Sequence, residues 1–264
     1  MSTAAIAVDT TRPGVPLSRL VKVELRKMFN TRSGFWLMMS IAALATIATV
    51  IVLLIQVLND NADVTYGIYS QAVGTPMAIL LPVIAILSVT SEWTQRTGLI
   101  TFTLAPNRAQ IIWAKALSAI IVGLVSMVLA MAIGAVGYVV GTTIAGDTYD
   151  WDVTVRQFVF ILIANVLGLL IGFMLGVLIR NSAAAIVGYF VYSLVIPGLL
   201  AVLAELWGWF KDVQPWIDFN YSSSKLFSDS VSGEEWAQIG TSGLIWLVIP
   251  LTLGVLAVMK SEVK

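Results

Sequence analysis

Hydrophobic positions gather into six long runs along this chain, and polar segments separate the runs. A helix needs about 20 apolar residues to cross the hydrocarbon core of a bilayer. Because a backbone in lipid must satisfy its own hydrogen bonds, runs of this length predict helices. The pattern therefore predicts an all-α integral membrane protein whose spans cover residues 35–58, 74–91, 111–141, 158–179, 183–203 and 239–259. Residues 66–74, just before the second span, fit either a helix or a loop.

The amino-acid composition also places most of the chain in lipid. Hydrophobic residues make up 58% and charged residues 11%, whereas a soluble domain has about 25% charged residues. The chain has no cysteine and no histidine, which excludes disulfides, thiolate chemistry and imidazole-based metal sites or proton relays. The net charge is zero, so nothing favours binding to nucleic acid. We expect no catalytic site, cofactor or metal on this chain.

The basic residues predict the orientation, because cytoplasmic loops carry an excess of lysine and arginine. With the N-terminus inside, all but three of the 15 basic residues face the cytoplasm; the exceptions are Arg156, Lys211 and Lys225. We therefore expect a plasma-membrane protein with both termini and the segment 92–110 in the cytoplasm. Residues 1–16 are polar and lack the apolar core of a signal peptide, so a flexible cytoplasmic tail is expected there.

Residues 17–33 have the pattern of an interfacial helix before the first span. At about 100° per residue, apolar residues fall on one side of this helix and basic residues on the other. The apolar side consists of Leu17, Leu20, Val21, Leu25, Met28 and Phe29. Val23 and Glu24 break the pattern. We expect the apolar side to lie in the acyl boundary and the basic side to face anionic headgroups. The helix serves either as an anchor alone or also as a contact for a cytoplasmic partner.

The connection between the second and third spans reads SEWTQRTGLITFTLAPNRAQIIWAK, residues 91–115. Its centre, GLITFTL at 98–104, stays half-apolar although it lies outside the spans. Asn107 and Gln110 have the spacing of a capping box, which predicts the start of the next helix. Exposed apolar side chains usually mark a binding site. The alternative is that they pack on the interfacial helix or lie along the membrane.

The outer connection 204–238 is the second long one, and short interfacial or re-entrant helices are expected in it. It carries a dense aromatic group that includes Trp207, Trp209, Phe210 and Trp216. Tryptophan prefers the membrane interface, so these residues form either an aromatic belt or an outer lid over a pathway.

The spans carry no ionisable residue near their centres. Charged residues at that depth usually mark ion pathways and proton relays, so a proton- or sodium-coupled carrier is disfavoured. A phosphate-binding loop of the Gly-x-x-x-x-Gly-Lys-Ser/Thr type does not occur in the sequence. If transport is driven by ATP, the nucleotide site therefore lies on another chain.

Small residues recur at every fourth position of the fourth span: Ala164, Gly168, Gly172 and Gly176. This spacing predicts close packing of helix backbones. Pro82, Pro197 and Pro250 fall inside the second, fifth and sixth spans, where proline kinks a helix and frees a carbonyl group.

From residue 17 to 264 the chain resembles the membrane subunit, or permease, of a type-2 ABC transporter, the exporter of drugs, antibiotics or lipids. The resemblance covers the N-terminal helix with VELRKMFNTRSGFW, the six spans and the outer excursion after the fifth span. Its most specific part is the segment 91–115, which is similar to the family pattern of an acid, glycine with Thr/Leu/Ile, Leu-x-x-Pro, arginine and then lysine. Leu104-Ala-Pro106 stands here where the pattern has Leu-x-x-Pro. In the family this segment is the coupling helix that docks on the ATPase. The resemblance implies the following contacts with the ATPase: Glu92, Arg96, Gly98, Leu99, Leu104, Pro106 and Arg108.

The resemblance also implies an assembly. Two ABC ATPase subunits would hold ATP and Mg, and a second permease, identical or paralogous, would complete the pathway in the membrane lipid. Such a complex moves an amphipathic or apolar substrate (a drug, antibiotic, lipid or lipopeptide) outward by alternating access. One alternative is a sensory or immunity ABC module without bulk transport. Another is a structural membrane scaffold that needs no ATPase.

Overall fold

The structure is a computed structural model that describes residues 15–30, 32–59, 63–94, 108–228 and 230–260. These residues form helices with short connections, and none of them belongs to a strand. The longest helices are α1 (Leu17–Asn30), α2 (Arg32–Leu58), α3 (Tyr66–Thr94), α5 (Arg108–Ala145) and α6 (Val155–Ile179). Shorter pieces follow: α7 (Ser182–Phe190), η1 (Val191–Val195), α8 (Ile196–Leu206), α9 (Gly208–Ile217), α10 (Phe219–Ser224), η2 (Lys225–Phe227), α11 (Gly233–Gly243), η3 (Leu244–Val248) and α12 (Ile249–Lys260).

Six stretches in the described part of the chain are long and apolar enough to cross a membrane. They are Gly34–Leu58, Tyr66–Trp93, Arg108–Ala145, Val155–Ile179, Ser182–Leu206 and Gly233–Lys260. The predicted all-α class with six candidate spans is thereby confirmed. Residues 66–74, which fitted a helix or a loop, are helical. The helix α5 has 38 residues, about 57 Å at 1.5 Å per residue. It therefore extends well beyond a hydrocarbon core of about 30 Å.

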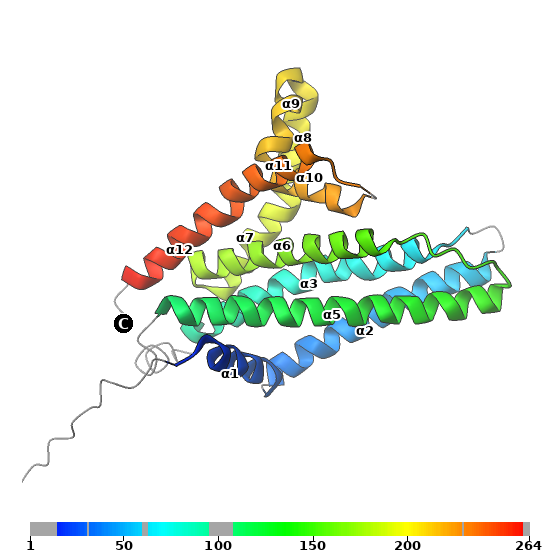
Figure 1. Cartoon of the computed structure of the whole chain (residues 1–264), viewed down its shortest axis with the longest axis horizontal. Helices are drawn as coiled ribbons and strands as arrows, with labels where there is room; N and C mark the ends of the chain where they lie inside the picture. The colour runs from blue at the N-terminus through cyan, green and yellow to red at the C-terminus, as the bar shows by residue number, and fades with distance from the viewer. Residues whose placement is uncertain (1–14, 31, 60–62, 95–107, 229, 261–264) are drawn as a thin grey trace, which may run out of the picture.

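Four of these helices, α2, α3, α5 and α6, run side by side as a bundle (Figure 1). Large apolar side chains that are almost fully buried fill its interior, among them Met77, Leu81, Met127 and Phe173. They come from α3, α5 and α6, so these three helices share one core. The helix α1 packs beside the start of α5 (Figure 1). Its position is therefore set by the bundle.

The last two candidate spans lean away from the bundle. The stretches α7–η1–α8 and α11–η3–α12 diverge from it, and α8 and α9 form a projecting tip (Figure 1). The helix α8 buries none of its residues, and Leu199, Val202 and Leu206 are each more than half exposed. An apolar surface of this kind needs lipid or another chain against it. The short helices α9 and α10 lie where short outer helices were expected.

Two π-helical turns interrupt these splayed spans. Each turn ends directly before an Ile-Pro pair. The turn η1 leads into Ile196 and Pro197, and η3 leads into Ile249 and Pro250. In both, the isoleucine N–H bonds the carbonyl five residues earlier. Proline lacks an N–H and crowds the carbonyl four residues before it, which a wider turn accommodates. The expected break in the regular helix therefore occurs at these two prolines, whereas Pro82 lies inside an uninterrupted α3.

The helices α3 and α6 approach each other closely at two of the small residues in α6. A Cβ atom on Gly172 would lie 2.5 Å from the carbonyl oxygen of Pro82. One on Gly176 would lie 3.3 Å from the α3 backbone, while Gly168 has nothing within 4 Å of such an atom. Ala164 packs in the core between α6 and the splayed spans. The predicted close packing is therefore concentrated at Gly172 and Gly176.

The two ends of the bundle carry different sets of charged residues. One end, called the basic end below, has the end of α3, the start of α5 and the end of α6, with Arg108, Lys115 and Arg180. The other, the acidic end, has the connection after α5, with Asp147, Asp150 and Asp152. The end of α12 also lies at the basic end, since the Arg108 guanidinium donates to the Val258 carbonyl at 3.3 Å. That this end faces the cytoplasm stays a prediction.

Candidate functional site

Four charged side chains from three helices meet at the basic end, and we call them the ionic cluster. They are Glu24 and Lys27 of α1, Glu92 of α3 and Lys115 of α5. They meet because α1 packs beside the start of α5, where α3 ends. Two carboxylates and two ammonium groups give the cluster no net charge, which is the condition for keeping charges away from water.

Lys115 is the centre of the ionic cluster. Its ammonium nitrogen lies 2.7 Å from a Glu24 oxygen and 3.0 Å from a Glu92 oxygen. It also donates to the backbone carbonyl of Ser88 at 3.3 Å, so three oxygen atoms surround its ammonium group. The Lys115 side chain is only 5% exposed. A buried ammonium group needs such partners, and Lys115 therefore joins α1 to α3 through α5.

Lys27 closes the cluster on its outer side. Its ammonium nitrogen lies 2.6 Å from Glu24 and 3.4 Å from Glu92, and its side chain is 47% exposed. Each carboxylate therefore contacts both lysines. Because Lys27 is half exposed to solvent, its ion pairs are weaker than those of Lys115.

The charges also shift the titration of the two α1 residues. Burial by itself would raise the pKa of Glu24, but the ammonium groups of Lys115 and Lys27 outweigh it and hold the pKa below its ordinary 4.5. Burial would lower the pKa of Lys27, but the carboxylates of Glu24 and Glu92 outweigh it and hold the pKa above its ordinary 10.5. Both residues are therefore charged throughout the physiological pH range.

Hydrogen bonds from α5 extend the contact with α1. The Ser118 hydroxyl donates to the carbonyl of Val21 at 3.3 Å. The Gln110 side chain donates to the carbonyl of Val15, just before α1, at 3.0 Å. The helix α1 is thus held along its first turns as well as at Glu24.

Helices α7 and α12 are tied to the same end of the bundle. Near the end of α3, the hydroxyls of Thr90 and Ser182 lie 2.7 Å apart, which joins α3 to the start of α7. At the start of α5, Arg108 donates to α12. The residues on both sides of the segment 95–107 therefore contact α1, α7 and α12, so the helix ends next to this segment are coupled.

The structure describes two of the residues expected to contact an ATPase. Glu92 is 7% exposed, and its carboxylate points at lysines of the same chain. Arg108 is half-buried and bonds α12. Both side chains therefore position the ends of the segment in this structure. The others lie outside the described residues, so their role stays a prediction: Arg96, Gly98, Leu99, Leu104 and Pro106.

Glu24 is the buried residue of α1. It was expected to break the amphipathic pattern, and a charged side chain on the buried side of the helix is such a break. Glu24 lies on the same side of the helix as Val21 and Met28, three and four residues away, and Lys115 compensates its charge. Of the predicted apolar residues, four are half-buried and two are exposed. The half-buried ones are Leu20, Val21, Leu25 and Met28, and the exposed ones are Leu17 and Phe29. That α1 lies at a membrane surface stays a prediction.

The sequence places Lys115 among the cytoplasmic charges but does not identify its partner. The usable signal is a lone lysine inside an apolar stretch together with a glutamate on the apolar side of a predicted helix. Fully buried lysine and glutamate are rare unless they are paired. The signal therefore indicates that both residues need a partner of opposite charge, but it does not say which residue that partner is.

The predicted outer aromatic residues lie at the projecting tip. Trp207, Trp209 and Trp216 are exposed, and Phe210 is buried. The rings of Trp207 and Trp209 are stacked with centroids 6.4 Å apart. A belt of aromatic rings and a lid both fit these positions, and the lid stays a prediction.

A small cavity of about 170 Å³ lies between α3, α6, α7, η1, α10 and η2. Its lining includes Asn165, Tyr192, Asn220 and Ser223, and none of the four predicted lid residues. The Tyr192 hydroxyl is buried without a hydrogen-bond partner among the described residues. The sequence pattern did not predict this cavity, because its lining comes from six elements, some of them distant in the sequence.

The docking of α1 should depend on pH in a defined window. The chain has no cysteine, so Val21→Cys introduces a single thiol on the α5-facing side of α1, and Val23→Cys, at a position 48% exposed, is the reference. The pKa of Glu24 is lower in the folded state than its ordinary 4.5. The ionised carboxylate therefore stabilises the docked α1 fully above pH 4.5, and this stabilisation is lost as the pH falls through the lower pKa of the folded state. The labelling rate of Val21→Cys divided by that of Val23→Cys should be constant above pH 4.5 and rise below it.

A disulfide reagent that reacts in acid measures this ratio. Glu24→Gln should raise the ratio at neutral pH and remove most of its acid dependence. A ratio that already rises between pH 7 and pH 5, or that ignores Glu24→Gln, would contradict the role of the ionic cluster.

Comparison with known proteins adds no family to this picture. No protein-family model matches the chain, and no curated protein matches it significantly. The functional argument therefore depends on the residues and their geometry.

Proposed function

We propose that this chain is the membrane-spanning permease subunit of a type-2 ABC exporter, driven by separate ATPase subunits that grip the segment 92–110. The sequence pattern of residues 91–115 and the six candidate spans support this proposal. The observation that carries it is the ionic cluster. It joins the two helices that flank the segment 95–107 to each other and to α1.

The ionic cluster suits the transmission of force. Separating buried, opposite charges is unfavourable, so Glu92 at the end of α3 and Lys115 near the start of α5 would move together. Glu24 would make α1 follow, and the close contact at Gly172 would make α6 follow α3. ATP-driven closure of two ATPases would then tilt these helices as one body. Such a motion would alternate the access of the pathway between the two sides of the membrane.

The partners follow from the same proposal. Two ABC ATPase subunits bind ATP and Mg, and a second permease, identical or paralogous, completes the pathway. The exposed apolar face of α8 supports a further chain or lipid at that position. The substrate is an amphipathic or apolar molecule, such as a drug, antibiotic, lipid or lipopeptide, because the spans carry no ionisable residue near their centres.

Placing charge in the predicted coupling segment should release the ATPase. The double variant Leu99→Asp/Leu104→Asp should lose most of the co-purifying ATPase and its activity, while still inserting into the membrane, because burying a carboxylate in an apolar contact is strongly unfavourable. The measurement is affinity purification of the tagged chain from native membranes in mild detergent. Partner proteins are then identified and ATP hydrolysis is measured.

Val155→Asp is the matched control. Val155 is 82% exposed at the start of α6, and aspartate is favourable at a helix N-terminus, so the ATPase should stay bound. A wild-type chain that comes out alone in several detergents would overturn the proposal in favour of a scaffold. An ATPase that stays bound to the double variant would overturn the role of the segment. A bound ATPase without substrate efflux from vesicles would favour a sensory module.

A further inference from the structure

An apolar groove of about 630 Å³ lies between α1, α2 and α5. Leu25 and Phe29 of α1 line one end, and Met38 and Ile41 of α2 lie across from α5. Among the described residues that line it, Ser126 alone has a polar side chain. The interior of the groove therefore suits a hydrocarbon chain and offers almost nothing to a polar ligand.

The groove is longer than one leaflet of the hydrocarbon core is thick. Its lining along α5 runs from Ile121 to Val136, which corresponds to about 22 Å at the rise of an α-helix. Half of a hydrocarbon core is about 15 Å thick. An acyl chain that enters at α1 can therefore lie in the groove over its whole length.

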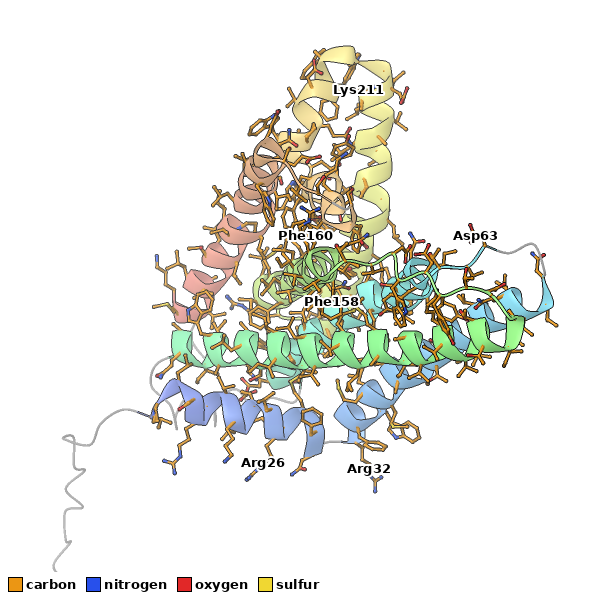
Figure 2. All side chains as sticks on the ribbon, turned by 45° about the vertical axis from the view of Figure 1, so that its right-hand side comes forward. Arg26, Arg32, Asp63, Phe158, Phe160 and Lys211 are labelled. Atoms are coloured by element: carbon orange, nitrogen blue, oxygen red, sulfur yellow. The ribbon has the colours of Figure 1, made fainter. Side chains whose placement is uncertain are left out.

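The α1 end of the groove carries exposed positive charge. Lys22 lies one turn before Leu25, Arg26 follows Leu25, and Arg32 begins α2; all three cations are exposed. None of them forms an ion pair with another described residue. Arg26 and Arg32 project from the same side of the molecule, away from the bundle (Figure 2). Lys27, in contrast, is already paired with Glu24 and Glu92 in the ionic cluster.

We propose that this groove binds one anionic phospholipid, with an acyl chain along α5 and the phosphate at Lys22, Arg26 and Arg32. The apolar lining selects a lipid, and the exposed cations select its charge. Guanidinium groups bind phosphate oxygens through two parallel hydrogen bonds. A zwitterionic lipid places a cation near the same residues, so its binding is weaker. The site does not depend on an ATPase partner.

The bound lipid has a structural consequence. It contacts α1, α2 and α5 at once and bridges the junction between α1 and α2. The ionic cluster holds α1 through Glu24 and Lys27, and the lipid holds it through Leu25 and Phe29. Anionic lipid therefore strengthens the docking of α1, which the proposed function uses to transmit force.

Native mass spectrometry of the purified, delipidated full chain tests this site. The protein is titrated with phosphatidylglycerol or phosphatidylcholine of the same acyl composition, and the first bound lipid is counted. We expect one phosphatidylglycerol per chain, bound about 100-fold more tightly than phosphatidylcholine, which is about five-fold for each of the three cations. The variant Lys22→Gln/Arg26→Gln should weaken phosphatidylglycerol binding by about five-fold for each removed charge. Its binding of phosphatidylcholine should stay unchanged.

Two further variants separate the charge from the groove. Ala132→Phe places a ring in the groove, where Ala132 is exposed, and should weaken both lipids. Lys211→Gln removes an exposed cation at the projecting tip (Figure 2) and should leave both unchanged. A thermal melt shows whether Ala132→Phe is folded, and the charge variant tests the proposal without altering the core.

Several outcomes would overturn the site. One is equal binding of the two lipids, and another is unchanged phosphatidylglycerol binding by the charge variant. A third is a dimer that takes up no lipid and dissociates with Ala132→Phe, since the groove would then hold a second copy of the chain. All three leave the ATPase experiment untouched, so the two proposals fail separately.

Discussion

Replacing Lys115 with methionine should lower the free energy of unfolding by about 3–5 kcal/mol, because two carboxylates lose their buried cation. Methionine keeps the length and most of the volume of lysine, so the loss of charge dominates over packing. Glu24 and Glu92 are 8% and 7% exposed and cannot turn to water without moving α1 or α3. Thermal denaturation in detergent, followed by size exclusion or by the fluorescence of the tryptophans, measures the effect.

Two variants identify the cause. Lys27→Met should cost about 1 kcal/mol or less, since this lysine is 47% exposed and Lys115 stays in place. Adding Glu24→Gln and Glu92→Gln to Lys115→Met should recover most of the lost stability, because no buried charge is left unpaired. If Lys115→Met were as stable as the wild type, or the triple variant no better than the single one, the ionic cluster would not be the contact that joins these helices.

Gly172→Ala should destabilise the bundle by about 1–3 kcal/mol, the usual effect of overpacking a close contact. The new Cβ atom would lie 2.5 Å from the carbonyl oxygen of Pro82 and 2.8 Å from its Cα atom. These are backbone atoms, so no side chain can rotate to make room. The helices α3 and α6 would have to move apart. The measurement is the same thermal denaturation, at matched detergent and lipid.

Gly168→Ala is the control on the same helix, one turn earlier. Nothing lies within 4 Å of a Cβ atom at Gly168, and alanine favours helix by about 1 kcal/mol over glycine. This variant should therefore be as stable as the wild type or slightly more stable. If both alanine variants were equally destabilised, the backbone contact at Pro82 would not be the cause of the destabilisation by Gly172→Ala.

The ionic cluster and the contact at Gly172 connect the same set of helices. The ionic cluster joins α1, α3 and α5, and the glycine contact joins α3 to α6, so a displacement at the segment 95–107 would reach four helices. If the proposed function holds, Lys115→Met and Gly172→Ala should both lower ATP-driven transport, even where the ATPase stays bound. That result would separate coupling from association, which Leu99 and Leu104 are expected to govern.

The sequence by itself determined the class of the fold and its candidate spans. Runs of about 20 apolar residues have one common solution in lipid, because helices satisfy all their backbone hydrogen bonds internally. The expected helix at 17–33 is present as Leu17–Asn30, and the span expected at 158–179 is present as Val155–Ile179. Local patterns are enough for such elements, since length and periodicity are properties of the segment alone.

Only the tertiary structure decided which residues meet. Glu24 and Lys115 are 91 residues apart, and Glu24 broke the pattern by which the helix α1 was recognised. Three glycines in α6 had the same spacing, yet Gly172 and Gly176 lie against α3 and Gly168 does not. Which face of a helix meets which neighbour depends on how the helices are packed and shifted along one another. Hydrophobic periodicity does not encode that register, so the partners of a buried charge emerge only when the whole bundle is assembled.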